Sequence, residues 1–205
     1  MLHQGGALKK TIMVIVGLPG AGKSEVSSFY KEQGLPMFRT GDVFREEVVS
    51  RGLELTPENS EMIARRLREE QGRDVAARIT MEKILKLTDM LICVEGPRDM
   101  DELAYIAKLS KLILLVLKAG DNTRFRRQLN RGKSGRDPGN KVKGFRNPKD
   151  RKEFDWRDGK EKERGLAEVL KTKKYPRYEI ENEGTIGELR VKAARVLSAI
   201  RSSAR

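Results

Sequence analysis

Residues 17–24 combine glycines with a lysine and a hydroxyl residue at a spacing that suits phosphate binding. The stretch reads Gly17, Leu18, Pro19, Gly20, Ala21, Gly22, Lys23 and Ser24, and it fits the pattern G-x-x-x-x-G-K-[ST] throughout. The glycines let several backbone N–H groups point into one concave anion site. Lys23 can reach the β and γ phosphates of a nucleotide, and the Ser24 hydroxyl can bind Mg²⁺. The sequence therefore predicts a nucleotide phosphate site in this loop.

The segments on either side of the loop have the pattern that such a site requires. Residues 11–16 form a short, continuous, largely β-branched apolar run, which is typical of a strand buried on both faces. Residues 23–33 have helical character and stop before Gly34, a residue type that commonly follows a helix. The loop thus leads from a buried strand into a helix N-terminus, where the helix dipole favours anions.

The composition limits the class of protein. A chain of 205 residues with 38% hydrophobic residues is long enough for one well-buried α/β domain, which we expect to span 1–205 with residues 1–10 disordered. The single Cys93 excludes an internal disulfide, and a single histidine makes histidine-based catalysis unexpected. No apolar run approaches the ~18 residues of a membrane span, and no cleavage site follows residues 12–18, so we expect a cytoplasmic protein.

Positive charge is concentrated in the second half of the chain. The net charge is +13, and residues 121–177 contain 20 lysines and arginines against 9 acidic residues. Such an excess indicates an anionic partner, either nucleotide phosphates, nucleic acid or both. Residues 132–152 are basic, rich in turn residues and without apolar period, which predicts a mobile loop. Phe145 is the one aromatic residue there that could stack on a nucleic-acid base.

The remaining pattern alternates between strands and helices. We expect four further strands, at residues 35–39, 90–95, 111–117 and 178–182. Helices are expected at residues 42–51, 57–71, 74–87, 99–108, 123–131, 153–171 and 185–200. This order predicts an α/β, three-layer P-loop NTPase sandwich with a five-stranded parallel sheet. Ligands of such sheets bind beyond the carboxyl ends of the strands.

Charged residues follow three of these strands, where phosphoryl transfer would need them. The candidates are Asp42, Arg45, Glu95, Arg98, Arg127 and Arg131. Arginines can neutralise phosphate charge between donor and acceptor, and a carboxylate can hold Mg²⁺. Three interpretations stay open. Asp42 could instead cap a helix that begins at residue 43, Arg98 could pair only with Asp99 or Asp101, and Arg157 and Arg164 are additional lid candidates.

Several of these motifs resemble those of known nucleotide kinases. The run Thr40-Gly41-Asp42-x-x-Arg45 is similar to the Thr-Gly-Asp-x-x-Arg signature of adenylate kinases, and Gly96-Pro97-Arg98 resembles their Gly-Phe-Pro-Arg element with one residue missing. The run Asn182-Glu183-Gly184-Thr185 resembles a late loop of dephospho-CoA kinase. Over residues 11–200 the chain resembles an archaeal family of adenylate-kinase-related, dephospho-CoA-kinase-like P-loop proteins.

The resemblance implies a nucleoside monophosphate kinase-like layout. It implies a helical acceptor-binding segment at 40–88 and a basic lid at 132–175, with Arg45 on the acceptor phosphate and Asn182 and Gly184 beside the adenine. In dephospho-CoA kinase the residue that matches Asp42 is the base. The chain departs from adenylate kinases at Glu95, where they carry Asp, and in a longer, more basic lid.

The leading hypothesis is therefore Mg²⁺-dependent transfer of the γ-phosphate of ATP, with GTP an open alternative, to a nucleotide-like acceptor. Catalysis falls to Lys23, Asp42, Arg127 and Arg131, acceptor binding to Asp42, Arg45 and Arg98, and Mg²⁺ binding to Ser24 and Glu95. The alternatives are phosphorylation of a dephospho-CoA-like hydroxyl, an NTP-hydrolysing switch, and a nucleotide-regulated protein that binds RNA through residues 132–152. The acceptor's identity and the oligomeric state are left open.

Overall fold

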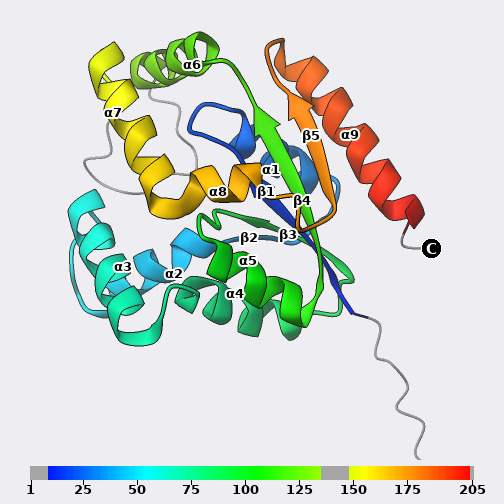
Figure 1. Ribbon diagram of the computed structural model, residues 1–205, viewed down its shortest axis with the longest axis horizontal. Helices are drawn as coiled ribbons and strands as arrows, with labels where there is room; N and C mark the ends of the chain where they lie inside the picture. The colour runs from blue at the N-terminus through cyan, green and yellow to red at the C-terminus, as the bar shows by residue number, and fades with distance from the viewer. Residues whose placement is uncertain (1–8, 135–147, 204–205) are drawn as a thin grey trace, which may run out of the picture.

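A computed structural model describes residues 9–134 and 148–203 of the chain, with the side chains of 131–134 left out (Figure 1). Its centre is a parallel sheet in the order β2-β3-β1-β4-β5. The strands are β1 (Thr11–Val16), β2 (Met37–Arg39), β3 (Leu91–Glu95), β4 (Lys111–Lys118) and β5 (Arg177–Glu181). The structure confirms the predicted α/β sandwich with a five-stranded parallel sheet.

Strand β1 lies at the middle of the sheet and contributes side chains to both layers of the core. It pairs with β3 through Thr11 and Leu91 and with β4 through Thr11 and Lys111. All six of its residues are buried, because successive side chains of a strand point to opposite faces and both faces are covered. The continuous apolar run in the sequence is the signature of this position.

Each face of the sheet is covered by its own group of helices. The first face packs against α4 (Val75–Leu85), α5 (Met100–Leu109) and α8 (Ala167–Lys171). The second packs against α1 (Lys23–Glu32) and α9 (Ile186–Ser203). Figure 1 shows α9 alongside β5 at the edge of the sheet. No helix of the described residues is long and apolar enough to cross a membrane.

A smaller core lies beyond the sheet, between α2 (Thr40–Ser50), α3 (Pro57–Gln71) and the start of α4. These helices fall within the predicted acceptor-binding segment 40–88. The predicted start of α3 is confirmed, because Thr56 caps it by accepting a hydrogen bond from the Asn59 amide at 3.1 Å.

The predicted lid at 132–175 begins at the end of α6 (Asp121–Ser134) and contains α7 (Arg151–Glu161), a wide helical turn, η1 (Lys162–Leu166), and α8. One continuous helix over residues 153–171 was expected, and this prediction is wrong. The helical path breaks at Gly165, whose φ is 101°, so that α7, η1 and α8 form a bent rod running from α6 back to the sheet (Figure 1). Most of the basic loop 132–152, including Arg136 and Phe145, lies outside the described residues.

Two other boundaries differ from expectation near the site. Strand β2 begins at Met37 rather than at residue 35, and Leu35 is instead buried in the core under α1. Helix α2 begins at Thr40, two residues earlier than expected. The chain therefore passes from β2 directly into α2 without a loop, which places Asp42 inside the helix.

Candidate functional site

The phosphate loop joins β1 to α1 and closes on itself through a hydrogen bond from the Ala21 amide to the Leu18 carbonyl at 3.1 Å. Gly22 stands at the N-cap of α1 with φ 106° and ψ 10°, a left-handed conformation, and no side chain caps the helix. A Cβ at Gly22 would lie 2.4 Å from Asn182 Nδ2, so only glycine fits there. The first amides of α1 are thus left without a capping side chain, as an anion site at a helix N-terminus requires.

Lys23 and Ser24, the two reactive side chains of the loop, begin α1. Lys23 Nζ donates to the carbonyls of Gly17 at 2.7 Å and Leu18 at 3.3 Å, so its ammonium lies back over the loop. Ser24 is exposed. The loop therefore places a cation and a hydroxyl at the carboxyl end of β1, where ligands of parallel sheets bind.

Glu95 ends β3 beside this loop and is 9% exposed. Its Oε2 accepts a hydrogen bond from Ser27 Oγ at 2.9 Å and lies 3.4 Å from Arg39 Nε. Ser27 is one helical turn after Ser24, so Ser24 and Glu95 border the same turn of α1. These partners explain how a carboxylate is tolerated at the end of a buried strand.

The donor set at this point fits Mg²⁺. The described residues hold no group of three histidine, cysteine or acidic side chains that could bind a metal. Mg²⁺ does not need one, because it usually keeps several waters and binds one or two protein oxygens together with substrate phosphates. The Ser24 hydroxyl and the Glu95 carboxylate supply oxygens of that kind.

Asp42 and Arg45 lie one turn apart in α2 and bind each other. Arg45 Nη1 donates to Asp42 Oδ1 at 2.5 Å, and both side chains are partly exposed. The interpretation of Asp42 as an N-cap is wrong, because α2 begins at Thr40 and Arg39 holds the cap position. Thr40 and Gly41 are already helical, so Asp42 lies within the first turn of α2.

Arg98 follows β3 and pairs with the lid. Its Nε lies 3.1 Å from Glu161 Oε2 at the end of α7. The alternative in which it pairs with Asp99 or Asp101 is wrong, because Arg73 takes Asp99 with a 2.6 Å hydrogen bond and lies 3.9 Å from Asp101. Neither Arg73 nor Glu161 could be identified as a partner from the sequence, because both are distant along the chain.

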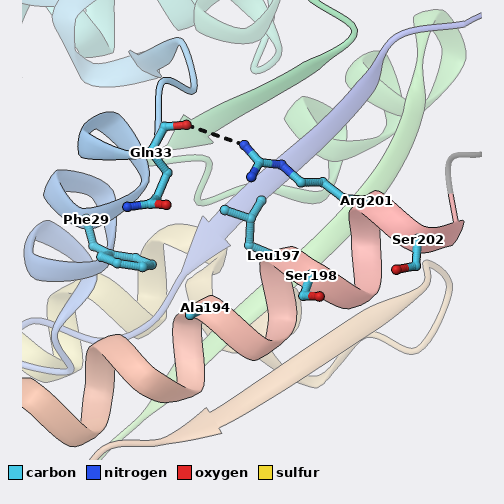
Figure 2. A pocket seen from close by; sticks show the side chains of 7 residues that line it. All are labelled: Phe29, Gln33, Ala194, Leu197, Ser198, Arg201 and Ser202. Atoms are coloured by element: carbon cyan, nitrogen blue, oxygen red, sulfur yellow. Dashed lines mark hydrogen bonds between the residues drawn. The ribbon is translucent and has the colours of Figure 1, made fainter.

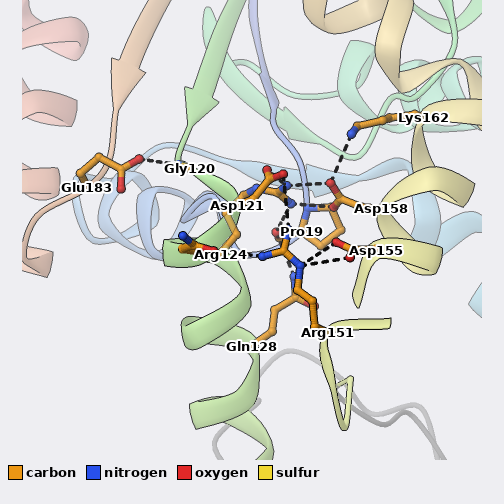
Figure 3. A network of polar contacts seen from close by, with 11 residues as sticks. Pro19, Gly120, Asp121, Arg124, Gln128, Arg151, Asp155, Asp158, Lys162 and Glu183 are labelled. Carbon is orange, nitrogen blue, oxygen red and sulfur yellow. Dashed lines mark hydrogen bonds and ion pairs between the residues drawn. The ribbon is translucent and has the colours of Figure 1, made fainter. Parts of the chain in front are cut away.

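The predicted adenine loop lies against the phosphate loop. Asn182 is 4% exposed, and its Nδ2 donates to the Ala21 carbonyl at 2.9 Å. Glu183 accepts hydrogen bonds from the Gly120 amide and from Thr123 Oγ1, shown in part in Figure 3. The Thr123 hydrogen bond is the main cause that lowers the pKa of Glu183. The loop is thereby fixed to the start of α6.

Arg127, a predicted catalytic residue, contacts this same loop. It donates to the Asn182 carbonyl at 2.9 Å and to the Gly184 carbonyl at 3.1 Å. The structure therefore brings Arg127 to the predicted adenine side. Arg131 lies in α6, but its side chain lies outside the described part of the chain.

Sequence reasoning missed the role of Arg124, which belongs to the same arginine-rich helix. It is 1% exposed and donates to both carboxylate oxygens of Asp158 at 2.6 Å, to Asp121 at 2.7 Å and to the Pro19 carbonyl at 3.1 Å (Figure 3). Burial alone would lower the pKa of Arg124, but the hydrogen bonds that it donates to Asp158 and Asp121 raise it overall. Arg124 therefore joins the lid to the phosphate loop.

No sequence signal marks this position, because arginine and glutamine side chains are mostly exposed. Gln128 follows Arg124 by four residues, so the two share a face of α6. Gln128 Nε2 also donates to the Pro19 carbonyl, at 3.1 Å. Only the packing of α6 against the phosphate loop identifies this face as its buried side.

A pocket of about 320 Å³ lies elsewhere, between α1 and α9 (Figure 2). Its lining residues are Phe29, Gln33, Ala194, Leu197, Ser198, Arg201 and Ser202. They belong to the last turns of both helices, whereas the phosphate loop lies at the first turn of α1. We therefore assign the candidate site to the loop, where the charged groups converge.

The fold and the loop together define a P-loop kinase-like protein. A family model described as an AAA domain matches residues 16–143. The structure of TT1252 from Thermus thermophilus has a TM-score of 0.58 and 21% identity, covering 96% of this chain and 98% of that one. A shikimate kinase from Acinetobacter baumannii, solved with shikimate, has a TM-score of 0.50 and 14% identity, with 96% and 95% covered. At these identities the likeness concerns the fold alone.

The sequence relatives identify the family. A UPF0200 protein of Hyperthermus butylicus is 36% identical over 191 residues, which cover 93% of this chain and 95% of that protein. The chain belongs to the UPF0200 family, which agrees with the resemblance to an archaeal P-loop family.

Proposed function

We propose that the protein transfers the γ-phosphate of ATP to a nucleotide-like acceptor with the help of Mg²⁺. The observation that carries this proposal is the complete phosphate loop, with Lys23 Nζ folded over the carbonyls of Gly17 and Leu18. The loop lies in a kinase-like fold. Glu95 ends β3 and Arg98 follows it, and the Asp42–Arg45 pair follows β2. Phosphoryl transfer consists largely of positioning and charge neutralisation, which these groups can supply.

Each group has a distinct proposed role. Lys23 and the loop amides hold the donor phosphates, and Ser24 and Glu95 hold Mg²⁺, which would neutralise charge on the transferred group. Arg45 and Arg98 hold the acceptor. Because Arg127 contacts the carbonyls of Asn182 and Gly184, we propose that it fixes the loop beside the nucleotide base.

The lid would exclude water from the reacting phosphate. Arg124 connects α6 with both Asp158 in α7 and Pro19 in the phosphate loop. A lid held in this way shields the donor from hydrolysis, because water would otherwise compete with the acceptor for the phosphoryl group.

The proposed role of Asp42 depends on the kind of acceptor. An acceptor that attacks with a phosphate oxygen needs no base, so Asp42 would only orient Arg45 through their 2.5 Å hydrogen bond. A dephospho-CoA-like acceptor attacks with a hydroxyl, and Asp42 would then accept its proton. Asp42 is partly exposed, which leaves it accessible to such a substrate.

Product analysis by mass spectrometry tests the proposal. The protein is incubated with Mg-ATP and AMP, CMP, GMP, UMP or dephospho-CoA, with Lys23→Ala as the inactive control. We expect one phosphorylated acceptor from the wild type and none from the variant. Release of ADP and free phosphate with every acceptor would favour an NTP-hydrolysing switch instead. If a product forms, Asp42→Asn separates the two acceptor classes, because only hydroxyl phosphorylation should lose about 100-fold or more in rate.

A further inference from the structure

Arg68 in α3 is a half-buried arginine whose charge is not balanced by an ion pair. Its guanidinium lies 4.6 Å from the centre of the Phe44 ring, which orients the group and shields one of its faces from water. Within residues 9–134 and 148–203 no carboxylate forms an ion pair with Arg68. Burial is the main cause that lowers the pKa of Arg68, and the nearby carboxyl groups of Glu102 and Asp99 oppose this shift without forming an ion pair with the guanidinium.

Two further arginines, from different elements, lie close enough for their charges to act on Arg68. Arg98 and Arg164 share Glu161, at 3.1 Å and 3.2 Å. Arg164 also binds Glu61 of α3 through both carboxylate oxygens, at 2.6 Å and 2.5 Å. Glu61 precedes Arg68 by seven residues, so the two lie on one face of α3. The charges of Arg98 and Arg164 lower the pKa of Arg68 further, which is consistent with one common cluster.

The backbone around this arginine cluster (Arg68, Arg98 and Arg164) is held in place from two sides. Gly165 packs on the turn after β3, and a Cβ there would lie 2.7 Å from the Arg98 carbonyl. On the other side, the buried Glu102 carboxylate accepts a hydrogen bond from the Arg98 amide at 2.8 Å. Fixed donors lose less freedom when a ligand binds, so the cluster is pre-organised for an anion.

We propose that Arg68 binds a phosphate group of the acceptor, together with Arg98 and Arg164. This inference rests on the proposed function, because it takes the bound anion to belong to the acceptor. A guanidinium matches two phosphate oxygens at once, and a phosphate offers enough oxygens for more than one arginine. The ligand would supply the counterion that Arg68 lacks.

The structure also explains why Arg68 differs from the arginines beside it in α3. Arg66 pairs with Glu70 at 2.7 Å on the exposed face, and Arg65 is exposed and forms no ion pair within the described part of the chain. Neither stacks on a ring of the described residues. Arg65 is therefore a matched control, because its replacement removes the same charge from the same helix outside the cluster.

Calorimetric titration with inorganic phosphate tests the cluster without requiring catalysis. The titration uses Lys23→Ala as the background, which weakens anion binding at the phosphate loop. In that background we expect Arg68→Met to weaken phosphate binding about 10- to 100-fold, as for the loss of a charge-assisted hydrogen bond. Arg68→Lys should bind phosphate with an affinity between those of Arg68→Met and the Lys23→Ala background. Lysine keeps the positive charge but loses the paired N–H groups of the guanidinium. Arg65→Met should change the affinity less than about 3-fold, as expected for an exposed charge.

Two results would overturn the inference. Phosphate affinity that is the same with and without Arg68 would show that the anion binds elsewhere, and equal losses for Arg68→Met and Arg65→Met would show a general charge effect. A separate titration of the otherwise wild-type protein with a non-hydrolysable Mg-ATP analogue reports on the donor site. Failure of that titration counts against the proposed function, whereas the phosphate titration decides the role of Arg68 independently.

Discussion

Arg124 and Arg68 are both withdrawn from solvent near the candidate site, yet their surroundings are opposite. Arg124 lies between α6, α7 and the phosphate loop, and its terminal nitrogens are bound by two aspartates and a carbonyl. Arg68 lies between α2 and α3, stacks on Phe44 and forms no ion pair within the described chain. The charge of Arg124 is balanced by aspartates of the protein, whereas Arg68 has hydrogen-bonding capacity left for a ligand.

The difference separates a structural arginine from a binding one. A buried cation whose partners are all internal contributes to the fold, and removing it strands the partner carboxylate. A partly buried cation without a counterion is costly in the free protein, and a bound anion recovers that cost. We therefore expect mutations on the Arg124 side to act mainly on stability and mutations on the Arg68 side mainly on binding.

The largest expected effect is on stability at Arg124. Arg124→Met should lower the free energy of unfolding by about 3 kcal/mol, because it leaves the buried Asp158 with only Lys162, at 3.5 Å, as a counterion. Urea denaturation followed by circular dichroism measures the change. Arg66→Met is the control, because the exposed Arg66–Glu70 pair of α3 lies outside this cluster and should contribute little to stability.

A double variant shows whether the charge itself is responsible. Arg124→Met combined with Asp158→Leu removes both buried charges, so it should recover part of the lost stability. If the double variant is no more stable than Arg124→Met, the loss comes from packing against Phe154 and the Pro19 carbonyl rather than from the stranded carboxylate.

An effect that depends on pH is expected at Glu102 on the acceptor side. Burial raises the pKa of this carboxyl from 4.5 to about 7, although Arg68 and Arg98 oppose the shift. Below about pH 4.5 the carboxyl is protonated in both states. As the pH rises toward 7, the unfolded chain loses the proton while the folded chain keeps it, so stability falls. Above about pH 7 the loss is complete, at about 3 kcal/mol.

Glu102→Gln isolates this effect, because its amide oxygen can still accept the hydrogen bond from the Arg98 amide. Unfolding free energies of wild type and variant are compared from pH 5 to pH 8. We expect the variant to gain on the wild type steadily up to about pH 7 and to remain ahead above it. A difference that stays constant across this range would mean that Glu102 is ionised in the folded protein throughout.

The smallest stability effect is expected at Arg68. Arg68→Met should change the free energy of unfolding by about 1 kcal/mol or less, since it removes a stacking contact and no ion pair. Thermal unfolding of Arg68→Met and Arg124→Met under the same conditions measures the loss of stability in each variant. A loss at Arg68 as large as that at Arg124 would remove the distinction between the two regions and assign Arg68 to the fold.

Local features were predictable from the sequence because short-range interactions decide them. The phosphate loop, the buried run of β1 and the Thr56 cap of α3 each depend on residues within a few positions of one another. The sequence also predicted the order of strands and helices, and therefore which charged residues follow the strands. The break at Gly165 escaped prediction, because a glycine within a helical pattern is compatible with either outcome.

The partners of the charged residues were decided only by the tertiary structure. Sequence proximity suggested Asp99 or Asp101 for Arg98, whereas the fold brings Glu161 to Arg98 from the end of α7. The arginines of α6 look alike in sequence, yet one is buried. Whether a charge is paired, buried or open to a ligand depends on which distant elements pack around it. The sequence by itself thus determined the phosphate loop and the sheet that carries it, and long-range packing decided which arginines are structural and which can bind a ligand.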